Sequence, residues 1–125
     1  MTLGRIDSVF IWTDDAPKLK AFYGDKLGLE KAMEEGDFVA FKLPEGDSQI
    51  VVGPHSEVHG QTKEPNRVMV NFAVKSCQKT YEELKGRGVE FTKEPTPEPD
   101  GPVTIATFRD PDGNTLQLFE MTGPM

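Results

Sequence analysis

Short stretches of alternating apolar and polar residues recur along the chain, and each stretch predicts a β-strand. Residues two apart lie on the same face of a strand. Two stretches are most alike, RIDSVFIWT (5–13) and RVMVNFAVK (67–75). One face of each mixes aromatic, small and polar side chains, namely Ser8, Phe10, Trp12, Met69, Asn71 and Ala73.

Each of these strands is followed by a segment with helical periodicity. In DAPKLKAFYGDKLGLE, Asp15 is the expected N-cap and Pro17 stands in the first turn, where its missing N–H costs little. In SCQKTYEELKGRGVEF, Ser76 is the expected cap and Gly88 the expected end. Cys77 begins the apolar stripe of this second helix, so we interpret it as a packing residue. The sequence therefore predicts two amphipathic helices.

The chain also repeats itself. FKLPEGDSQIVV (41–52) and FRDPDGNTLQLF (108–119) share Phe, Pro, an acid and Gly at the same spacing, which predicts a hairpin in each half. Each half then has the order strand, helix and three strands. A polar stretch (54–67) links the halves, and the proline-rich stretch 93–102 is expected to be a surface loop.

These patterns predict a single α+β domain over residues 1–125. It contains two βαβββ modules, about 4–53 and 68–121. Modules of this kind each leave a sheet face uncovered, so they must pair, in one chain or across two. We expect curled mixed sheets with the helices on the outer faces and a cleft along the inner faces.

Charge and composition narrow the class of partner. The net charge is −7 and lysines and arginines do not cluster, which argues against nucleic acid as a partner. No apolar run approaches the roughly 20 residues of a membrane span, and the first residues do not resemble a secretory signal. The chain has one cysteine, which excludes an internal disulfide. A cytoplasmic location without membrane contact is the expectation.

Two segments carry a family resemblance. VFIWTDDAPKLKAFYGDKLGLE and FRDPDGNTLQLFE resemble the two ends of proteins in the vicinal oxygen chelate superfamily, which holds glyoxalase I, extradiol dioxygenases, and fosfomycin- and bleomycin-resistance proteins. The resemblance implies the paired βαβββ fold and a homodimer with its cleft at or near the subunit boundary. It says little about chemistry, because one scaffold hosts unrelated reactions.

Metal-dependent members of that superfamily hold their ion with four strand positions, usually His, Glu or Gln. The resemblance maps these positions onto Ser8, onto Ile50 or Val51, onto Met69 and onto Gln117. A hydroxyl, an alkyl group, a thioether and one amide are poor ligands for a divalent ion. We therefore expect no metal and no cofactor at the place that the family uses.

The favoured hypothesis is a metal-independent binding protein, similar in scheme to the bleomycin-resistance proteins, for an apolar or aromatic small molecule. No nucleophile–base pair is evident, so no catalytic residue is assigned. The predicted ligand contacts are Ser8, Phe10, Trp12, Met69, Asn71 and Gln117. For Phe10 and Trp12, binding a ligand and filling the interior are both open interpretations.

Two other functions are open. One is a metal-dependent enzyme of the lyase, isomerase or dioxygenase type with an unusual ligand set, His55, Gln117 and Glu120. The other is an interaction subunit with a filled cleft. The simpler interpretations are that His55 and His59 are solvated loop residues and that Glu120 is an exposed surface acid. Asp110 and Asp112 are expected to serve turn formation.

Overall fold

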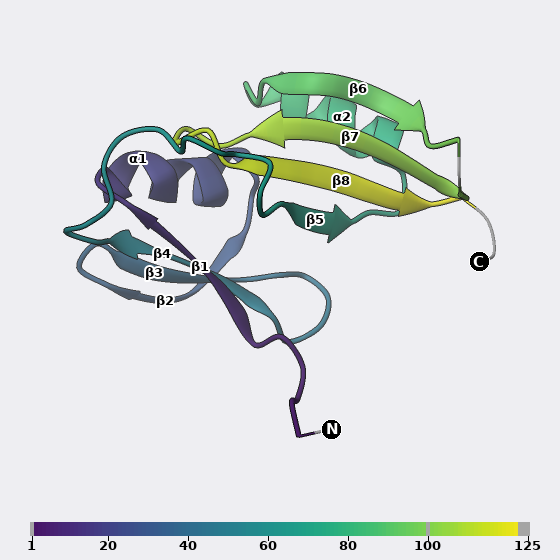
Figure 1. The fold of residues 1–125 in the computed structure, drawn as a ribbon. Coiled ribbons are helices and arrows are strands. Elements are labelled where there is room, and N and C mark those ends of the chain that lie inside the picture. Colours follow the sequence, from purple (N-terminus) through teal and green to yellow (C-terminus); the bar gives the residue numbers. More distant parts are fainter. Residues whose placement is uncertain (1, 100, 123–125) are drawn as a thin grey trace. The chain divides into compact units, whose positions relative to one another are not determined.

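The computed structural model describes residues 2–99 and 101–122, in which the chain forms two compact units, Met1–Gly60 and Gln61–Met125 (Figure 1). Each unit has the order strand, helix and three strands, and each contains one four-stranded sheet. The predicted α+β class and the two βαβββ modules are therefore confirmed.

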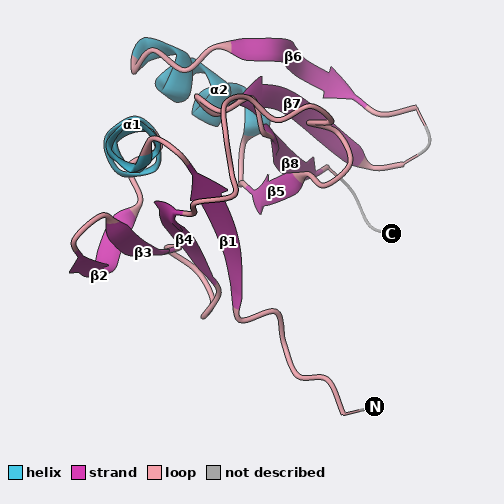
Figure 2. Ribbon diagram, turned by 60° about the vertical axis from the view of Figure 1, so that its left-hand side comes forward, coloured by secondary structure: helices cyan, strands magenta, loops and turns pink. Residues whose placement is uncertain are grey.

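The first unit is a mixed sheet in the order β1-β4-β3-β2, in which β1 runs parallel to β4 and the other pairs are antiparallel. Its elements are β1 (Ser8–Thr13), α1 (Ala16–Ala21), a π-helical turn η1 (Phe22–Lys26), β2 (Glu30–Glu35), β3 (Phe38–Lys42) and β4 (Gln49–Pro54). In Figure 2, α1 is seen end-on against one face of this sheet.

The second unit repeats the arrangement, with the sheet order β5-β8-β7-β6 and β5 parallel to β8. Its elements are β5 (Val70–Ala73), α2 (Cys77–Gly86), β6 (Phe91–Pro97), β7 (Val103–Arg109) and β8 (Thr115–Met121). Strand β5 begins one residue after Met69, so Met69 precedes the strand on which it was predicted.

Helix α1 begins as the sequence predicts. The Asp15 carboxylate accepts the Lys18 N–H and caps the first turn. The helix then widens at Phe22 into the π-helical turn η1, where a single amphipathic α-helix was expected. The wide turn buries both Phe22 and Tyr23, which are 5% and 0% exposed, and so increases the apolar area that the short helix covers.

Helix α2 follows the prediction more closely. The Ser76 hydroxyl accepts the Lys79 N–H at the start, and Gly88 adopts a positive φ of 90° just past the end. The helix lies on the strands of its own sheet. The buried residues of this unit include Cys77 and Leu84 of α2 and Leu116 and Leu118 of β8. Burial raises the pKa of the Cys77 thiol, and the nearby Glu120 carboxylate adds to this effect.

Each of the two repeated hairpins has a glycine at the turn position that requires a positive φ angle. Gly46 and Gly113 have positive φ angles of 78° and 84°, which residues with a side chain rarely adopt. In the second turn the Asp110 carboxylate accepts N–H groups from Asp112 and Asn114, so the expectation of turn chemistry is confirmed. The first hairpin is one residue longer, because Phe41 pairs with Ile50 whereas Phe108 pairs with Leu116.

The proline-rich segment differs from its prediction. Residues 91–97 form strand β6, although a surface loop was expected over 93–102. Strand β6 lies at the edge of its sheet, and its pairing with β7 shifts register between Phe91 and Lys93 and again between Lys93 and Thr96. An edge strand tolerates proline because one side of its backbone needs no partner.

The chain crosses from one unit to the other at Gly60 and Gln61. The Gly60 N–H donates to the Asp14 carboxylate at 2.8 Å, within the first unit. In the second unit the Gln61 amide donates to the Pro111 carbonyl, and the Thr62 N–H donates to the Asp112 carbonyl. Both sides of the crossing are thus held by hydrogen bonds. In the described part of the chain, no helix has the length and apolar character of a membrane span.

Candidate functional site

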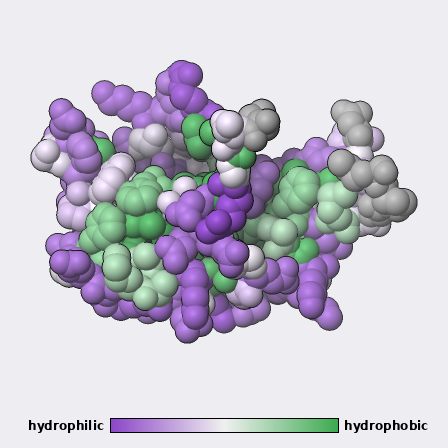
Figure 3. Space-filling model, turned by 90° about the horizontal axis from the view of Figure 1, so that it is seen from below, coloured by the Kyte–Doolittle hydropathy of each residue, from purple (hydrophilic) through white to green (hydrophobic). Residues whose placement is uncertain are grey.

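One face of the first sheet points away from α1 and carries three of the predicted contact residues. The β1–β4 register pairs Ser8 with Gln49, Phe10 with Val51 and Trp12 with Gly53. The other face, which α1 covers, holds fully buried residues such as Val39 and Phe41. Phe10 is 48% exposed and Trp12 is 37% exposed, which is unusual for large apolar side chains on a sheet. Figure 3 views the molecule from the side of the first unit that lies opposite α1 and shows apolar surface (green) among polar residues.

Four rings gather on this face, and we call them the aromatic cluster: Phe10, Trp12, Phe38 and His55. The Phe10 and Trp12 centroids are 5.4 Å apart, and each lies 6.0 Å from the Phe38 centroid with the planes tilted. The His55 ring meets Trp12 edge-on at 5.4 Å. These separations are typical of favourable aromatic pairs. The rings therefore already contact one another.

The backbone of β4 makes room for the cluster at Gly53. A Cβ atom on this residue would lie 2.7 Å from Cδ2 of Phe38 and 3.2 Å from the six-membered ring of Trp12. Phe38 and Trp12 belong to strands on either side of β4. Their rings approach each other across the glycine because it has no side chain.

His55 differs from its expectation. Its side chain is only half-buried, but it packs on Trp12 and its Nδ1 accepts the Glu57 N–H at 3.1 Å. His55 therefore lies in a loop as predicted but is only partly solvated, whereas His59 is exposed as expected. The signal that the sequence lacked is the turn after β4, in which the Val58 N–H donates to the His55 carbonyl and folds the loop back.

In the second unit, Asn71, Gln117 and Thr107 are direct neighbours across β5, β8 and β7. The Gln117 amide donates to the Thr107 hydroxyl at 3.2 Å. Asn71 is exposed, and Met69, before the strand, is 44% exposed. The row of polar groups gives Gln117 a partner, and Thr107 is the member that sequence reasoning missed. The turn between Arg109 and Thr115 has five residues, and counting back from it along β7 pairs Gln117 with Thr107.

Glu120 lies on the opposite face of β8 from Gln117, because the two residues are three apart. Its carboxylate accepts the Cys77 N–H at 2.7 Å and so caps α2, and the residue is half-buried. The expectation of an exposed surface acid is wrong for this reason. Since Gln117 and Glu120 point to opposite faces, the alternative metal set of His55, Gln117 and Glu120 is not brought together on one face.

Comparison with known proteins identifies the family. The model of the Glyoxalase/Bleomycin resistance protein/Dioxygenase superfamily matches residues 5–118. The chain belongs to this superfamily. A relative from Bacillus subtilis (strain 168), YurT, is 33% identical over 128 residues, which cover 92% of this chain and 96% of YurT. A second relative from the same strain, YetH, is 28% identical over 121 residues, covering 93% of this chain and 98% of YetH.

Solved structures share the superfamily fold. A superfamily member from Sphaerobacter thermophilus DSM 20745 is 27% identical with a TM-score of 0.72, covering 96% of this chain and 99% of that one. TnmS3, an antibiotic binding protein from Streptomyces sp. CB03234, is 20% identical with a TM-score of 0.77, covering 97% and 98%. At that identity the second likeness concerns the fold alone.

The side chains at the positions that the superfamily uses for metal binding show whether a divalent ion could be held there. Strand register decides between the two candidates for the second position, because Val51 shares the face of Phe10 whereas Ile50 is buried on the α1 side. The one-residue difference between the hairpins explains why sequence alone left both open. The resemblance thus maps the positions onto Ser8 and Val51 in the first unit and onto Met69 and Gln117 in the second. These side chains do not fit a divalent ion, and no group of three or more His, Cys, Asp or Glu able to hold one is found among residues 2–99 and 101–122.

Proposed function

We propose that this chain binds an apolar or aromatic small molecule, without a metal, and holds it unchanged. The observation that carries the proposal is the aromatic cluster, in which Phe10 and Trp12 keep 48% and 37% of their surface exposed. Exposed aromatic rings grouped on one face of a sheet offer a large apolar contact at little cost in conformational entropy.

The packing of the cluster favours binding over interior filling. Phe10, Trp12 and Phe38 hold one another in tilted contact, so the platform exists before a ligand arrives. A preformed apolar surface with a few polar groups nearby is typical of small-molecule sites. Ser8 on the same face, half-buried, supplies a hydroxyl. Met69, Asn71 and Gln117, the ligand contacts predicted from the sequence, belong to the second unit and stay predictions.

The family context supports the proposal. TnmS3 shares the fold and is described as an antibiotic binding protein, so the scaffold serves ligand binding in at least that relative. We assign no catalytic residue. The Cys77 thiol, the most reactive kind of side chain here, is fully buried at the start of α2, and its raised pKa disfavours the nucleophilic thiolate. The proposal extends to a cytoplasmic homodimer, which the composition and the resemblance predict.

Trp12 provides the test, because it is the chain's one tryptophan. Its fluorescence is followed while a panel of planar aromatic compounds of different charge is added. Compounds that quench or shift the emission are then titrated by calorimetry against the native protein and the Trp12→Ala and Phe10→Ala variants. The matched control is Leu3→Ala, which truncates an apolar side chain that is 80% exposed.

We expect Trp12→Ala to abolish detectable binding and Phe10→Ala to weaken it at least tenfold, or about 1.4 kcal/mol. The Leu3→Ala variant should bind like the native protein. Unchanged affinity in Trp12→Ala would show that the ligand lies elsewhere. Failure of every compound in the panel to bind would leave the interaction-subunit interpretation in its place.

A further inference from the structure

Two adjacent glutamates at the end of β2 have opposite environments. The β2–β3 register pairs Glu34 with Val39 and Glu35 with Phe38. Val39 is fully buried on the side that α1 covers, whereas Phe38 belongs to the aromatic cluster on the other side. Directly opposite residues of an antiparallel pair share a face, with their Cβ atoms about 4.5–5.5 Å apart. Glu35 therefore stands at the edge of the aromatic cluster.

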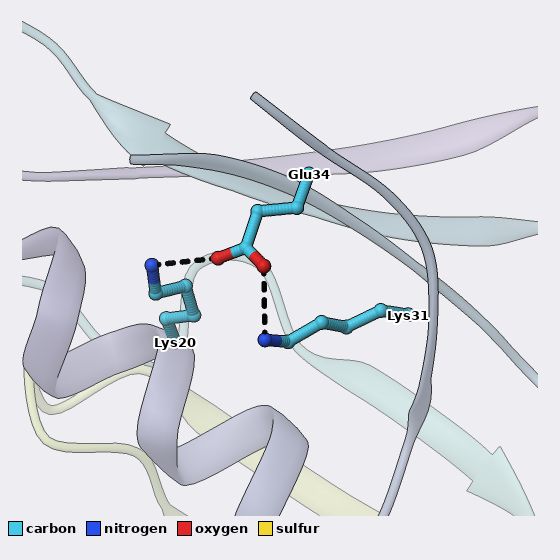
Figure 4. A network of polar contacts seen from close by, with 3 residues as sticks. All are labelled: Lys20, Lys31 and Glu34. Carbon is cyan, nitrogen blue, oxygen red and sulfur yellow. Dashed lines mark hydrogen bonds and ion pairs between the residues drawn. The ribbon is translucent and has the colours of Figure 1, made fainter. Parts of the chain in front are cut away.

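Glu34 is neutralised by lysines (Figure 4). Its two carboxylate oxygens accept hydrogen bonds from Lys20 of α1 at 2.9 Å and from Lys31 at 3.0 Å. The pKa of Glu34 is lowered, first by the Lys20 hydrogen bond and then by that of Lys31. This carboxylate fastens α1 to β2 and has no spare charge to offer a ligand.

Glu35 is in the contrary situation. It is exposed, and within residues 2–99 and 101–122 no lysine, arginine or histidine forms an ion pair with it. Lys42, a cation on the same face, is engaged by Glu30 at 3.3 Å. The negative charge of Glu35 beside the rings is thus left uncompensated.

The geometry of the rings limits how a ligand binds. Centroid separations of 5.4 to 6.0 Å leave no room for another ring to insert between Phe10, Trp12 and Phe38. A ligand must lie on the exposed side of the cluster. The electron-rich faces of exposed rings attract a positive charge placed over them, most strongly at tryptophan.

We propose that the ligand is a planar aromatic cation that rests on Phe10 and Trp12 and is attracted by the carboxylate of Glu35. This inference rests on the proposed function, because it assumes that the aromatic cluster is the binding surface. The protein's net charge of −7 acts in the same direction over longer distances.

Three probes with one ring system separate charge from shape. N-methylacridinium is cationic, acridine is neutral at pH 8, and acridine-9-carboxylate is anionic. Each is titrated at low salt into native protein, and binding is followed by the single tryptophan indole N–H resonance and by calorimetry. The variant is Glu35→Gln. Its control is Glu45→Gln, which removes the same charge from the exposed loop between β3 and β4.

We expect N-methylacridinium to bind about five- to tenfold more tightly than acridine, and the carboxylate to bind most weakly. Glu35→Gln should weaken the cation alone, by about two- to fivefold, and Glu45→Gln should leave that affinity nearly unchanged. Adding salt should reduce the same preference. Equal binding of the three probes, or no effect of Glu35→Gln on the cation, overturns this inference and leaves the proposed function standing. If no probe binds at the cluster in the native protein, both proposals fail.

Discussion

The ring of Phe38 lies so close to Gly53 that a Cβ atom there would be 2.7 Å from its Cδ2 atom. Gly53→Ala should therefore force the ring aside and, with it, the neighbouring Trp12. We expect a loss of about 1–3 kcal/mol in the free energy of unfolding, as in other overpacked sites. The tryptophan emission of the folded variant should also shift, and binding at the aromatic cluster should weaken. Urea unfolding followed by fluorescence measures the first two effects.

A second glycine provides the control for that substitution. Gly86, near the end of α2, has open space where a Cβ atom would be. Gly86→Ala should raise the free energy of unfolding by up to about 1 kcal/mol through helix propensity and leave the emission unchanged. If Gly53→Ala behaved like Gly86→Ala, the close packing of Phe38 and Trp12 over β4 would be contradicted.

The predicted contacts of the second unit are tested with amide truncations. Asn71→Ala and Gln117→Ala should each weaken binding of the probe that binds best by about two- to tenfold, the worth of one hydrogen bond. Calorimetry measures the loss. Gln78→Ala, which truncates an exposed amide on α2, is the matched control. Native affinity in both Asn71→Ala and Gln117→Ala would remove these residues from the site.

The β7–β8 turn depends on the Asp110 carboxylate, which is 5% exposed. It accepts the N–H groups of Asp112 and Asn114 at 3.0 and 2.9 Å, and also the Asn114 side-chain amide. Asp110→Ala should lower the free energy of unfolding by about 2–3 kcal/mol, because buried donors lose a charged acceptor. Asp47→Ala, in an exposed loop, should change it by less than about 0.5 kcal/mol. Equal effects of the two variants in urea titrations would contradict this role.

The Lys20–Glu34–Lys31 network predicts a pH dependence. The pKa of Glu34 is lowered by its hydrogen bonds to Lys20 and Lys31, so its stabilising contribution is present above the unfolded-state value near 4.5. That contribution is lost as the pH falls through the lower folded-state pKa. The pKa of Lys20 is raised by Glu34, so its contribution is present below 10.5 and is lost as the pH rises through the higher folded-state pKa.

Glu34→Gln should therefore reduce stability at neutral pH and flatten both limbs of the profile. Urea midpoints measured from pH 2 to pH 11 give the comparison, with Glu45→Gln as the control. Because these side chains are solvent-accessible, added salt should shrink the difference between native and variant. A Glu34→Gln profile parallel to the native one at both ends would show that the network adds nothing.

Metal binding is tested directly by titration. The side chains at the positions mapped by the resemblance, Ser8, Val51, Met69 and Gln117, are poor metal ligands. We therefore expect nickel, zinc and manganese to bind with a Kd no lower than about 1 mM, a binding free energy of about −4 kcal/mol. Calorimetry on tag-free protein, preceded by a metal analysis of the same sample, measures this. Stoichiometric binding at micromolar concentration would mean that other residues form a site, and a metal-dependent enzyme would become the leading hypothesis.

Local signals in the sequence were enough for the fold. Capping residues such as Asp15 and Ser76, and the glycines Gly46 and Gly113 in repeated hairpins, depend on backbone geometry within a few residues. Alternation along β1 likewise predicted that Phe10 and Trp12 share a face. The π-helical turn after α1 was missed because it accompanies the burial of both Phe22 and Tyr23, a tertiary contact that periodicity does not contain.

The candidate site depends on the pairing register between neighbouring strands, which the sequence alone does not give. Phe38, Gly53 and Glu35 join the site only through cross-strand pairing, and a one-residue change in hairpin length moves every side chain to the other face. The same uncertainty left Ile50 and Val51 open as one position. His55 was missed for a different reason, since a turn in a loop brings its ring back to Trp12.

The crossing between the two units has a consequence for proteolysis. A protease must draw several residues of extended backbone into its cleft, and Gly60, Gln61 and Thr62 are each held by a hydrogen bond. Exposure alone therefore does not make this segment a good substrate. Cleavage requires those bonds to break together, so the rate at which a dilute protease nicks the segment would measure how often it opens.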